Sequence, residues 1–327
     1  YFMGLLLIVL ALIDLRLGSI RISLGEMLGQ LLGKEALSEQ QLIILTKFRL
    51  PRLATALLAG AALPVCGLQM QTLFRNPLAG PYVLGISSGA SFGAALVVLG
   101  AGASGIAATW SLALAAWIGA GTVMLLLLFV SYRIKDVMTI LILGIMFSSG
   151  LAAVISIMQY FSQASALKSF VIWSMGSLGN VTTSQLVIMT WAVSPVLLIT
   201  LGYSKVLNGL MLGEEYAASM GIRIERTRII IFATTSILAG TITAFCGPIG
   251  FIGIAVPHVA RFLYRHSDHR ILMPATMLTG MVVMVFSDIV SQLPGTDRIL
   301  PINAVTSLIG IPVVIWLVIM NRKAQAL

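Results

Sequence analysis

The stretch RNPLAGPYVLGISSGAS (75–91) lies between two long apolar runs and decides how the chain is folded. Pro77 and Pro81 are expected to stop one helix and start the next, because proline is tolerated mainly in the first turn of a helix. Three glycines then recur every fourth residue along one helix face, at Gly85, Gly89 and Gly93. Small residues at this spacing let helix backbones approach closely in lipid. The stretch therefore predicts a turn followed by a tightly packed membrane helix.

The composition excludes a water-soluble globule. The chain has 327 residues, of which 58% are hydrophobic and 9% charged, whereas soluble domains carry about 25% charged residues. The apolar runs are continuous and do not alternate with polar residues, which excludes a membrane β-barrel. The formal net charge of +9 is attributed to basic cytoplasmic loops near anionic lipid and not to nucleic-acid binding. We predict an all-α, polytopic transmembrane bundle.

About ten segments are long and apolar enough to approach the roughly 20 residues of a membrane-crossing helix. They are residues 2–17, 51–72, 82–100, 106–131, 138–161, 185–203, 227–246, 249–265, 271–292 and 304–321. The first is interpreted as a shortened span and not as a signal peptide, because the chain begins at Tyr1 without a methionine. The spans are expected to form one transmembrane domain over residues 1–327.

The loops indicate an orientation. With the N-terminus in the cytoplasm, most of the 20 Lys and Arg residues fall on the cytoplasmic side, as the positive-inside rule requires. Both chain ends are then cytoplasmic. Residues 17–50 and 161–184 become the large outer segments, and residues 204–226 the largest inner one.

The inner segment 204–226 contains GEEYAASMG (213–221), which predicts a short helix. Glu214 and Glu215 lie in its first turn, where the helix dipole favours negative charge, and Gly221 suits a C-terminal cap. Such a helix can dock a soluble partner, or it can be an ordinary ordered loop. The loop by itself leaves both interpretations open.

Two segments suggest an internal repeat. LAGAALPVCG (58–67) and LAGTITAFCG (238–247) share Leu-Ala-Gly and, five residues later, Cys-Gly. The first copy lies in the second expected span and the second copy in the seventh. The two spans are five places apart in the series, an odd number, so the copies run in opposite directions, as in the inverted repeats of transporters.

Several kinds of chemistry are missing from the sequence. There is no nucleophile elbow, and the single Gly33-Lys34 pair is followed by Glu35 and makes no P-loop. The three histidines lie near one cytoplasmic end without a metal-ligand pattern, at His258, His266 and His269. Cys66 and Cys246 lie inside apolar runs and predict no disulfide. We expect no catalytic residue, no metal site and no ATP hydrolysis by this chain.

Acids inside the spans are few. Asp14 and Asp288 are the only ones within apolar runs, and both fall near outer ends. Ion-coupled carriers usually hold ionisable residues deep in the membrane. An ion-coupled secondary carrier is therefore the weaker alternative, and an intramembrane enzyme would need a polar catalytic pair that is not found. Energy is expected to come from a partner.

Several segments together resemble one family, the iron-chelate (siderophore), haem and cobalamin permeases of bacterial ATP-binding-cassette (ABC) importers, of the type II architecture. The matching segments are RLPRLATALLAGAALPVCGLQMQTLFRNPLAGPYVLGISSGAS (49–91), WSMGSLGNVT (173–182), LGEEYAASMGIRIERTR (212–228), GPIGFIGIAVPHVARFL (247–263), DHRILMPATMLTG (268–280) and LPINAVTSLIGIPVVIWLV (300–318). They follow one another over most of the chain.

The resemblance implies ten transmembrane helices per subunit, with spans 2–5 and 7–10 related by the inverted repeat. It implies a second permease subunit, most simply a second copy, around a central pathway in the bacterial inner membrane. It also implies two cytoplasmic ABC ATPase subunits, which bind ATP and Mg²⁺, and a periplasmic or lipid-anchored solute-binding protein. No cofactor is expected on this chain itself.

The resemblance further implies a coupling helix within the inner segment, at 212–223, that docks on the ATPase. The residues that match it are Leu212, Gly213, Glu214, Glu215, Ala218, Gly221 and Arg223. Closure of the ATPase pair is expected to move this helix, with the spans following as rigid bodies.

Docking of the binding protein is implied at basic residues of the outer face. In the RLPR motif these are Arg49 and Arg52, which the spacing of three places on one helix face. The alternative is that both side chains reach the lipid headgroups. A further basic position of the family is Gln292 here, for which Arg298 could substitute, and the acid expected before Leu-Pro is Ile299, for which Asp297 could stand in.

The resemblance places a cytoplasmic gate at Asn76 and Leu78, after span two, and at Val137 and Met138, before span five. Two apolar residues at the second pair predict a hydrophobic constriction that closes by dewetting. The alternative is that Met138 only begins the buried face of span five.

The substrate follows least directly from the sequence. WSMGSLGNVT (173–182) is more similar to siderophore and haem permeases than to cobalamin permeases. We therefore rank an iron siderophore first, haem second and cobalamin third. Whether the second subunit is another copy or a homologue stays open at this point.

Overall fold

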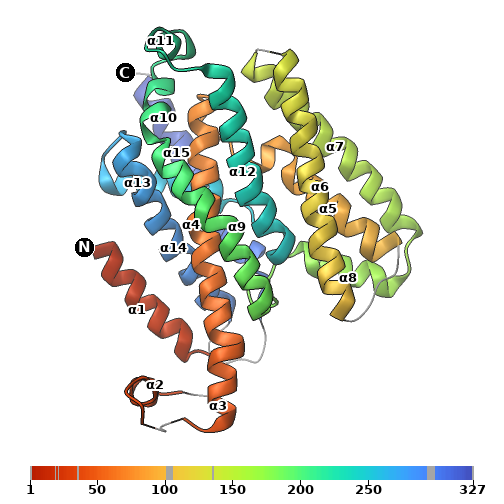
Figure 1. The fold of residues 1–327 in the computed structure, drawn as a ribbon, viewed down its shortest axis with the longest axis vertical. Helices are drawn as coiled ribbons and strands as arrows, with labels where there is room; N and C mark the ends of the chain where they lie inside the picture. The colour runs from red at the N-terminus through yellow and green to blue at the C-terminus, as the bar shows by residue number, and fades with distance from the viewer. Residues whose placement is uncertain are drawn as a thin grey trace.

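The computed structural model describes residues 2–18, 20, 22–34, 37–100, 106–134, 136–292 and 299–325. Within these ranges the chain is helical, without strands, and every one of the predicted spans coincides with a helix or a run of helices (Figure 1). The all-α, polytopic bundle predicted from composition is therefore confirmed.

The helices lie close to the predicted spans. Those of the first half are α1 Phe2–Arg16, α2 Leu24–Leu31, α3 Glu39–Ile44, the π-helical η1 Leu45–Arg49, α4 Leu50–Leu73, the 3₁₀ helix η2 Pro81–Leu84, α5 Ile86–Ala95, the π-helical η3 Leu96–Gly100, α6 Ile106–Arg133 and α7 Val137–Phe161. Those of the second half are α8 Ala164–Ser174, α9 Thr183–Gly202, α10 Ser204–Met211, α11 Glu214–Ser219, α12 Ile224–Cys246, α13 Ile252–Tyr264, α14 His269–Ser291 and α15 Ile302–Gln325.

Six helices of the described residues meet the length and apolarity of a full membrane span. They are Glu39–Leu73, Trp110–Arg133, Met138–Phe161, Thr183–Gly202, Ile224–Cys246 and His269–Ser291. Three shorter apolar helices accompany them, Ile86–Gly100, Ile252–Tyr264 and Ile302–Trp316. The chain is thus a multi-pass membrane protein.

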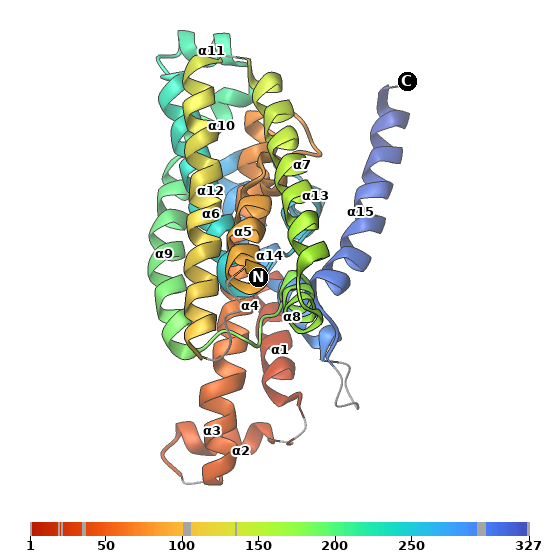
Figure 2. The ribbon, with the colours of Figure 1, turned by 90° about the vertical axis from the view of Figure 1, so that its right-hand side faces the viewer.

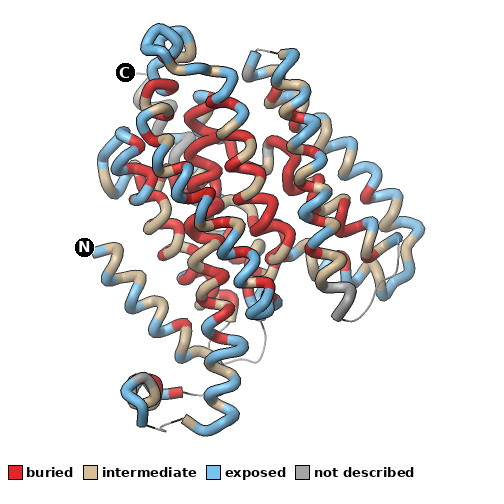
Figure 3. The backbone as a smooth tube through the Cα atoms, in the orientation of Figure 1, coloured by how far each residue is buried: buried red, intermediate tan, exposed pale blue. Residues whose placement is uncertain are grey.

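Helix α4 forms the centre of the bundle (Figures 1 and 3). The span that contains it is 83% buried, whereas the span that forms α7 is only 17% buried. The sequence of α4 explains its position, because its alanines and glycines leave room for neighbouring helices to approach. Helix α7 instead presents most of its surface outward, and Figure 2 shows the last part of α15 standing apart from the other helices.

The two copies of the Leu-Ala-Gly motif occupy corresponding places in the packing. A Cβ atom on Gly60 of α4 would lie 2.6 Å from the carbonyl oxygen of Gly280 in α14. Gly240, the matching residue of α12, faces Ala120 of α6, with 3.2 Å between the two Cβ positions. In the order of the predicted spans, span two (α4) packs on span nine (α14), and span seven (α12) packs on span four (α6). This exchange of partners agrees with the inverted repeat read from the sequence.

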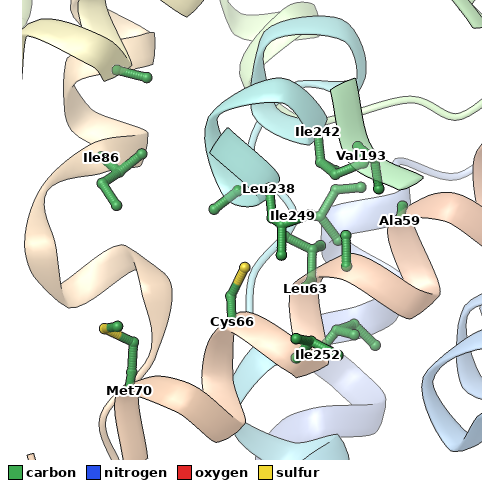
Figure 4. Close-up of a cluster of buried hydrophobic side chains, with 14 of the residues drawn as sticks. Ala59, Leu63, Cys66, Met70, Ile86, Val193, Leu238, Ile242, Ile249 and Ile252 are labelled. Atoms are coloured by element: carbon green, nitrogen blue, oxygen red, sulfur yellow. The ribbon is translucent and has the colours of Figure 1, made fainter. Parts of the chain in front are cut away.

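The buried core surrounds the Cys-Gly ends of the two motifs. Figure 4 shows side chains of α4, α12 and the segment after α12 meeting there, among them Leu63, Cys66 and Ile249. The Cys66 thiol lies 3.6 Å from the carbonyl oxygen of Thr235. Both cysteines are buried and free, as predicted.

Residues 247–251 form a buried to half-buried connection between α12 and α13, where the sequence predicted a continuous eighth span from residue 249. Helix α13 begins only at Ile252. The connection is held by the Tyr82 hydroxyl, which bonds the backbone of Ile249 on both its N–H and its carbonyl, and by Asn303, whose Oδ1 accepts the Gly250 N–H at 2.8 Å. Such irregular backbone can lie at membrane depth because the protein itself satisfies its polar groups.

The stretch that opened the sequence analysis forms the expected turn but divides the glycine stripe. Gly85 has φ +76° and joins η2 to α5, so it is a left-handed junction and not a residue of a continuous helix. A Cβ atom there would lie 2.9 Å from the Ser148 hydroxyl oxygen of α7. Gly89 and Gly93 instead face α6, where a Cβ would approach the carbonyl oxygens of Gly119 at 2.5 Å and Ala115 at 1.9 Å.

We expect Gly89→Leu to destabilise the folded protein by about 1–3 kcal/mol, since the side chain would force α5 away from the α6 backbone. The measurement is the fraction of detergent-extracted protein that stays monodisperse after heating. Gly121→Leu in α6 is the matched control, because nothing lies within 4 Å of its Cβ position. Equal heat resistance of the two variants would show that the close approach contributes nothing.

Candidate functional site

Helices α10 and α11 form a hairpin at one end of the bundle, opposite the end that carries α2 and α3 (Figure 1). We refer to residues 204–223, which include the glycine cap of α11, as the α10–α11 hairpin. Gly221 ends α11 with φ +85°, and the N–H groups of Gly221 and Ile222 donate to the carbonyls of Ala218 (2.9 Å) and Ala217 (3.0 Å). This pair of hydrogen bonds is a Schellman cap. The short helix and its glycine cap, both predicted from the sequence, are therefore present.

The hairpin is packed tightly against itself. A Cβ atom on Gly209 of α10 would lie only 2.4 Å from the Ile222 side chain and 3.2 Å from that of Met220. Ala217 of α11 is fully buried in the same contact. The two helices therefore move as one unit, because neither can shift without losing this contact.

An ion pair fixes the hairpin to α12. The Arg228 guanidinium donates to the Glu214 carboxylate through Nε (3.0 Å) and Nη2 (2.7 Å to Oε1 and 2.5 Å to Oε2). The Arg228 side chain is 7% exposed and that of Glu214 is 34% exposed. A two-pronged arginine–carboxylate contact fixes direction as well as distance, so it sets the angle between α11 and α12.

The residues assigned to a coupling helix lie mostly on the surface. Leu212, Glu215, Ala218, Gly221 and Arg223 are exposed, while Gly213 and Glu214 are half-buried. Tyr216 and Met220 add two more exposed apolar side chains. The hairpin thus presents an apolar surface with charges at its edge, which is the composition of a protein-docking element.

A cavity of about 780 Å³ lies between the hairpin, the end of α4 and the start of α7. Its lining is formed by Leu73, Phe74, Arg75, Asp136, Met138, Leu212, Gly213, Glu214, Glu215, Tyr216 and Arg228. Hydrogen bonds from Thr139, through its side chain and its backbone N–H, lower the pKa of Asp136, which caps the start of α7. The cavity brings the predicted gate residue Met138 together with the hairpin.

The other predicted gate residues lie in the turn after α4. The Asn76 Oδ1 accepts the Leu78 N–H at 2.9 Å, and Leu78 is exposed. Neither residue lines the cavity with Met138, and the side chain of Val137 is outside the described residues. The Pro77 carbonyl accepts from His258 Nε2 of α13 at 2.7 Å. The turn is therefore anchored to α13, a contact that the sequence did not reveal.

At the opposite end of the bundle, the arginines of the RLPR motif make contacts within the chain. Arg49 is 9% exposed and donates to the carbonyls of Leu15 (2.7 Å) and Ile20. Arg52 forms an ion pair with Asp288 of α14, through Nε (2.8 Å) and Nη2 (2.8 Å), and also donates to the Ser291 hydroxyl. Both guanidinium groups are therefore engaged by partners within the chain.

Asp14 of α1 joins this outer cluster through Gln292, whose Nε2 donates to Asp14 Oδ1 at 2.7 Å. Asp14 and Asp288 are both nearly inaccessible to solvent, at 3% and 1% exposure. A cavity of about 400 Å³ opens beside them, lined also by Arg49, Arg52 and Ile299. Arg298 and Asp297, the proposed substitutes for family positions, lie outside the described residues.

Several residues of these two sites were missed in the sequence. Arg228 was noted only as a positive charge of the inner side, and Asp288 only as an acid near an outer end. A charged residue inside an apolar run is expected to have a partner of opposite charge, and this signal was present in the sequence. It does not identify which residue is the partner. Among the described residues, no group of three or more His, Cys, Asp or Glu could hold a metal ion.

Helices that span a membrane, an exposed apolar hairpin at one end and a buried charge cluster at the other define a multi-pass membrane permease. Residues 6–320 match the FecCD transport family. The chain belongs to this family, whose members are permease subunits of ABC importers.

Curated relatives support the same assignment. The chain is 38% identical over 289 residues to the vitamin B12 import system permease protein BtuC of Klebsiella pneumoniae, covering 88% of this chain and 86% of the relative. It is also 38% identical over 278 residues to the protein of that name from Escherichia coli, covering 85% of this chain and 84% of the relative. These relatives are transport proteins of similar length to this chain.

Among solved structures, the fold is similar to a metal-chelate type ABC transporter in an inward-facing conformation. The TM-score is 0.87 at 30% identity, and the match covers 98% of each chain. The resemblance to this permease family, stated from the sequence, is therefore confirmed.

Proposed function

We propose that this permease moves a bulky metal chelate through the inner membrane into the cytoplasm, driven by ATP hydrolysis on a separate ATPase. The observation that carries the proposal is the α10–α11 hairpin, which exposes apolar side chains outside the bundle and is fixed to α12 by the Glu214–Arg228 pair. A surface of this kind fits a groove on a soluble partner. The orientation follows, with the hairpin and both chain ends in the cytoplasm.

In this proposal ATP and Mg²⁺ bind to the partner ATPase, and this chain changes conformation in response. Closure of the ATPase pair displaces the hairpin, and the fixed angle between α11 and α12 passes the displacement into the bundle. Leu212, Tyr216 and Met220 supply apolar contact area, while Glu215 and Arg223 supply charges at its edge.

The pathway lies along α7 and is completed by a second permease subunit, most simply another copy. Only 17% of this span is buried within the chain. Its exposed middle carries small or polar residues, Ser149, Gly150, Ala152 and Ala153, which suit a neutral conduit better than lipid. Met138 at the inner end, with Asn76, Leu78 and Val137, forms the proposed cytoplasmic gate.

The outer cluster is the proposed docking surface for a solute-binding protein. Arg49, Arg52 and Arg298 are its basic residues by resemblance. Arg52 lies at the rim of the outer cavity with its side chain 16% exposed, so an acidic residue of a binding protein would reach it only by competing with Asp288.

For the substrate we propose a cobalamin-type corrinoid first. The vitamin B12 permeases noted above, at 38% identity over most of the chain, support this order. It reverses the order suggested by the segment 173–182 alone, which favoured iron siderophores and haem. An iron siderophore is the second candidate, since that segment lies in part along the outer cavity through Ser177, Gly179 and Asn180.

The test uses reconstituted vesicles with the cytoplasmic face of the permease and its ATPase inside and the binding protein outside. Labelled cobalamin, a labelled ferric siderophore and labelled haem are offered separately, each with ATP on the cytoplasmic side. We expect cobalamin uptake that an excess of unlabelled cobalamin abolishes and that the other two chelates do not. Uptake of the siderophore alone would establish the second candidate, and uptake of none would contradict the metal-chelate assignment.

A further inference from the structure

A series of polar side chains connects the α10–α11 hairpin to α4, the central helix. Asn208 of α10 accepts on Oδ1 from the backbone N–H and the ring Nδ1 of His269, both at 2.8 Å. His269 is the first residue of α14, and its Nε2 lies 2.8 Å from the Thr72 hydroxyl in the last turn of α4. Three helices that are distant in sequence thus meet at one imidazole.

The hydrogen-bond partners define the direction of each bond. The Asn208 amide nitrogen donates to Asp268 Oδ1 at 2.6 Å, which leaves its Oδ1 as the acceptor toward His269. The ring Nδ1 must therefore carry a hydrogen, which leaves Nε2 of the neutral ring as an acceptor. The Thr72 hydroxyl oxygen lies 2.8 Å from Nε2 and 2.8 Å from the Leu68 carbonyl oxygen one turn earlier, so its single hydrogen is shared between these two acceptors. Hydrogen bonds from the Arg270 N–H and the Asn208 amide lower the pKa of Asp268, so it is a carboxylate at neutral pH.

The surroundings make this connection rigid. His269 is completely buried and Thr72 is 6% exposed, so water does not compete for their hydrogen bonds. On the hairpin side, Gly209 follows Asn208 directly and is in close contact with Ile222. On the α4 side, Thr72 lies one turn before the segment that carries Asn76 and Leu78.

We propose that His269 is a positioning residue that passes displacement of the α10–α11 hairpin to the cytoplasmic end of α4. This inference rests on the proposed function. It adds a second route by which movement of the hairpin reaches the bundle, separate from the Glu214–Arg228 contact with α12. Apolar side chains can slide past one another at little cost, whereas the two directional bonds of the buried ring, with the bond from the His269 backbone N–H, keep their register. Movement of α10 therefore carries the end of α4 and the turn that follows it.

The test interrupts one side of the connection at a time in the complete complex of permease, ATPase and binding protein. Thr72→Val deletes the hydroxyl that meets the imidazole, and Asn208→Leu deletes the acceptor on the hairpin side. The readout is the number of ligand molecules taken up per ATP hydrolysed, measured in vesicles with the ligand that the wild-type complex transports. ATP hydrolysis alone and the amount of assembled complex are measured in parallel.

We expect each variant to hydrolyse ATP within about twofold of the wild type and to transport about tenfold less ligand per ATP, as the loss of one buried hydrogen bond predicts. The double variant is expected to be no worse than either single variant, because both interrupt the same connection. His269→Asn keeps a polar group near the position of Nδ1, and His269→Gln keeps one near the position of Nε2. Both variants are expected to transport less ligand per ATP than the wild type, because each retains only one of the two hydrogen-bonding positions of the ring.

Thr55→Val is the matched control. Thr55 is a fully buried threonine of the same helix whose hydroxyl donates only to the Pro51 carbonyl, one turn earlier. It is expected to leave ligand per ATP unchanged. Equal ratios for Thr55→Val and Thr72→Val would overturn the proposal, and so would a parallel loss of ATP hydrolysis and transport in Thr72→Val, which would indicate a purely structural role. If the wild-type complex itself takes up no ligand with ATP, the proposed function fails instead.

Discussion

Replacing Asp288 with alanine is expected to destabilise the permease by about 3 kcal/mol, because it leaves a largely buried arginine without its carboxylate. Arg52 contacts Asp288 through two nitrogens and is 16% exposed, while Asp288 is 1% exposed. The measurement is the midpoint of thermal unfolding of the purified protein in detergent, followed by loss of monodisperse protein.

Two further variants separate charge from packing at this position. In the double variant Arg52→Met with Asp288→Leu both charges are absent, and it is expected to recover most of the lost stability. Glu225→Ala, at an exposed acid of α12, is the control and is expected to change little. A double variant as unstable as Asp288→Ala would show that the ion pair itself, and not the unpaired charge, determines stability.

Replacing Arg228 with alanine is expected to reduce ATP-driven transport about tenfold or more while assembled protein remains, since a charged hydrogen-bonded contact contributes roughly 1.5–3 kcal/mol. Arg228 fixes the hairpin to α12, and without it the hairpin can move while α12 stays in place. Transport and ATP hydrolysis are measured in the same vesicles, so that loss of coupling is distinguished from loss of the ATPase.

Arg226→Ala is the matched control for this experiment, because Arg226 is exposed on the same helix two residues earlier. Exchange of the two charges, Glu214→Arg with Arg228→Glu, is expected to recover part of the transport. Full transport by Arg228→Ala would mean that the hairpin does not act through α12.

Much of the fold was predictable because the bilayer imposes simple rules. Apolar length alone located the spans, and the two Leu-Ala-Gly motifs predicted an inverted repeat, whose glycines lie where α4 meets α14 and α12 meets α6. The sequence was less informative where the backbone departs from a regular helix. Gly85 fits a stripe of period four equally well as a helix residue or as a left-handed junction, and only its φ of +76° decides between them.

The candidate sites were predictable in location but not in contacts. The short helix α11 followed from two acids, a glycine cap and the family resemblance, whereas its pairing with α10 as a hairpin was not predicted. Its contacts with Arg228 and, through Asn208, with His269 did not, because nothing in a single sequence shows which distant residue faces a given side chain. The same holds for Arg52 and Asp288, which are 236 positions apart. Pairing of this kind is decided by packing of the helices and not by any local pattern.

The driving force of uptake tests the central claim most directly. Vesicles that contain the permease, its ATPase and its binding protein are given labelled ligand with either ATP on the cytoplasmic side or an imposed proton gradient. We predict uptake with ATP, none with the gradient alone, and none when the ATPase is left out. Uptake driven by the proton gradient without the ATPase would contradict the account and identify the chain as an ion-coupled carrier.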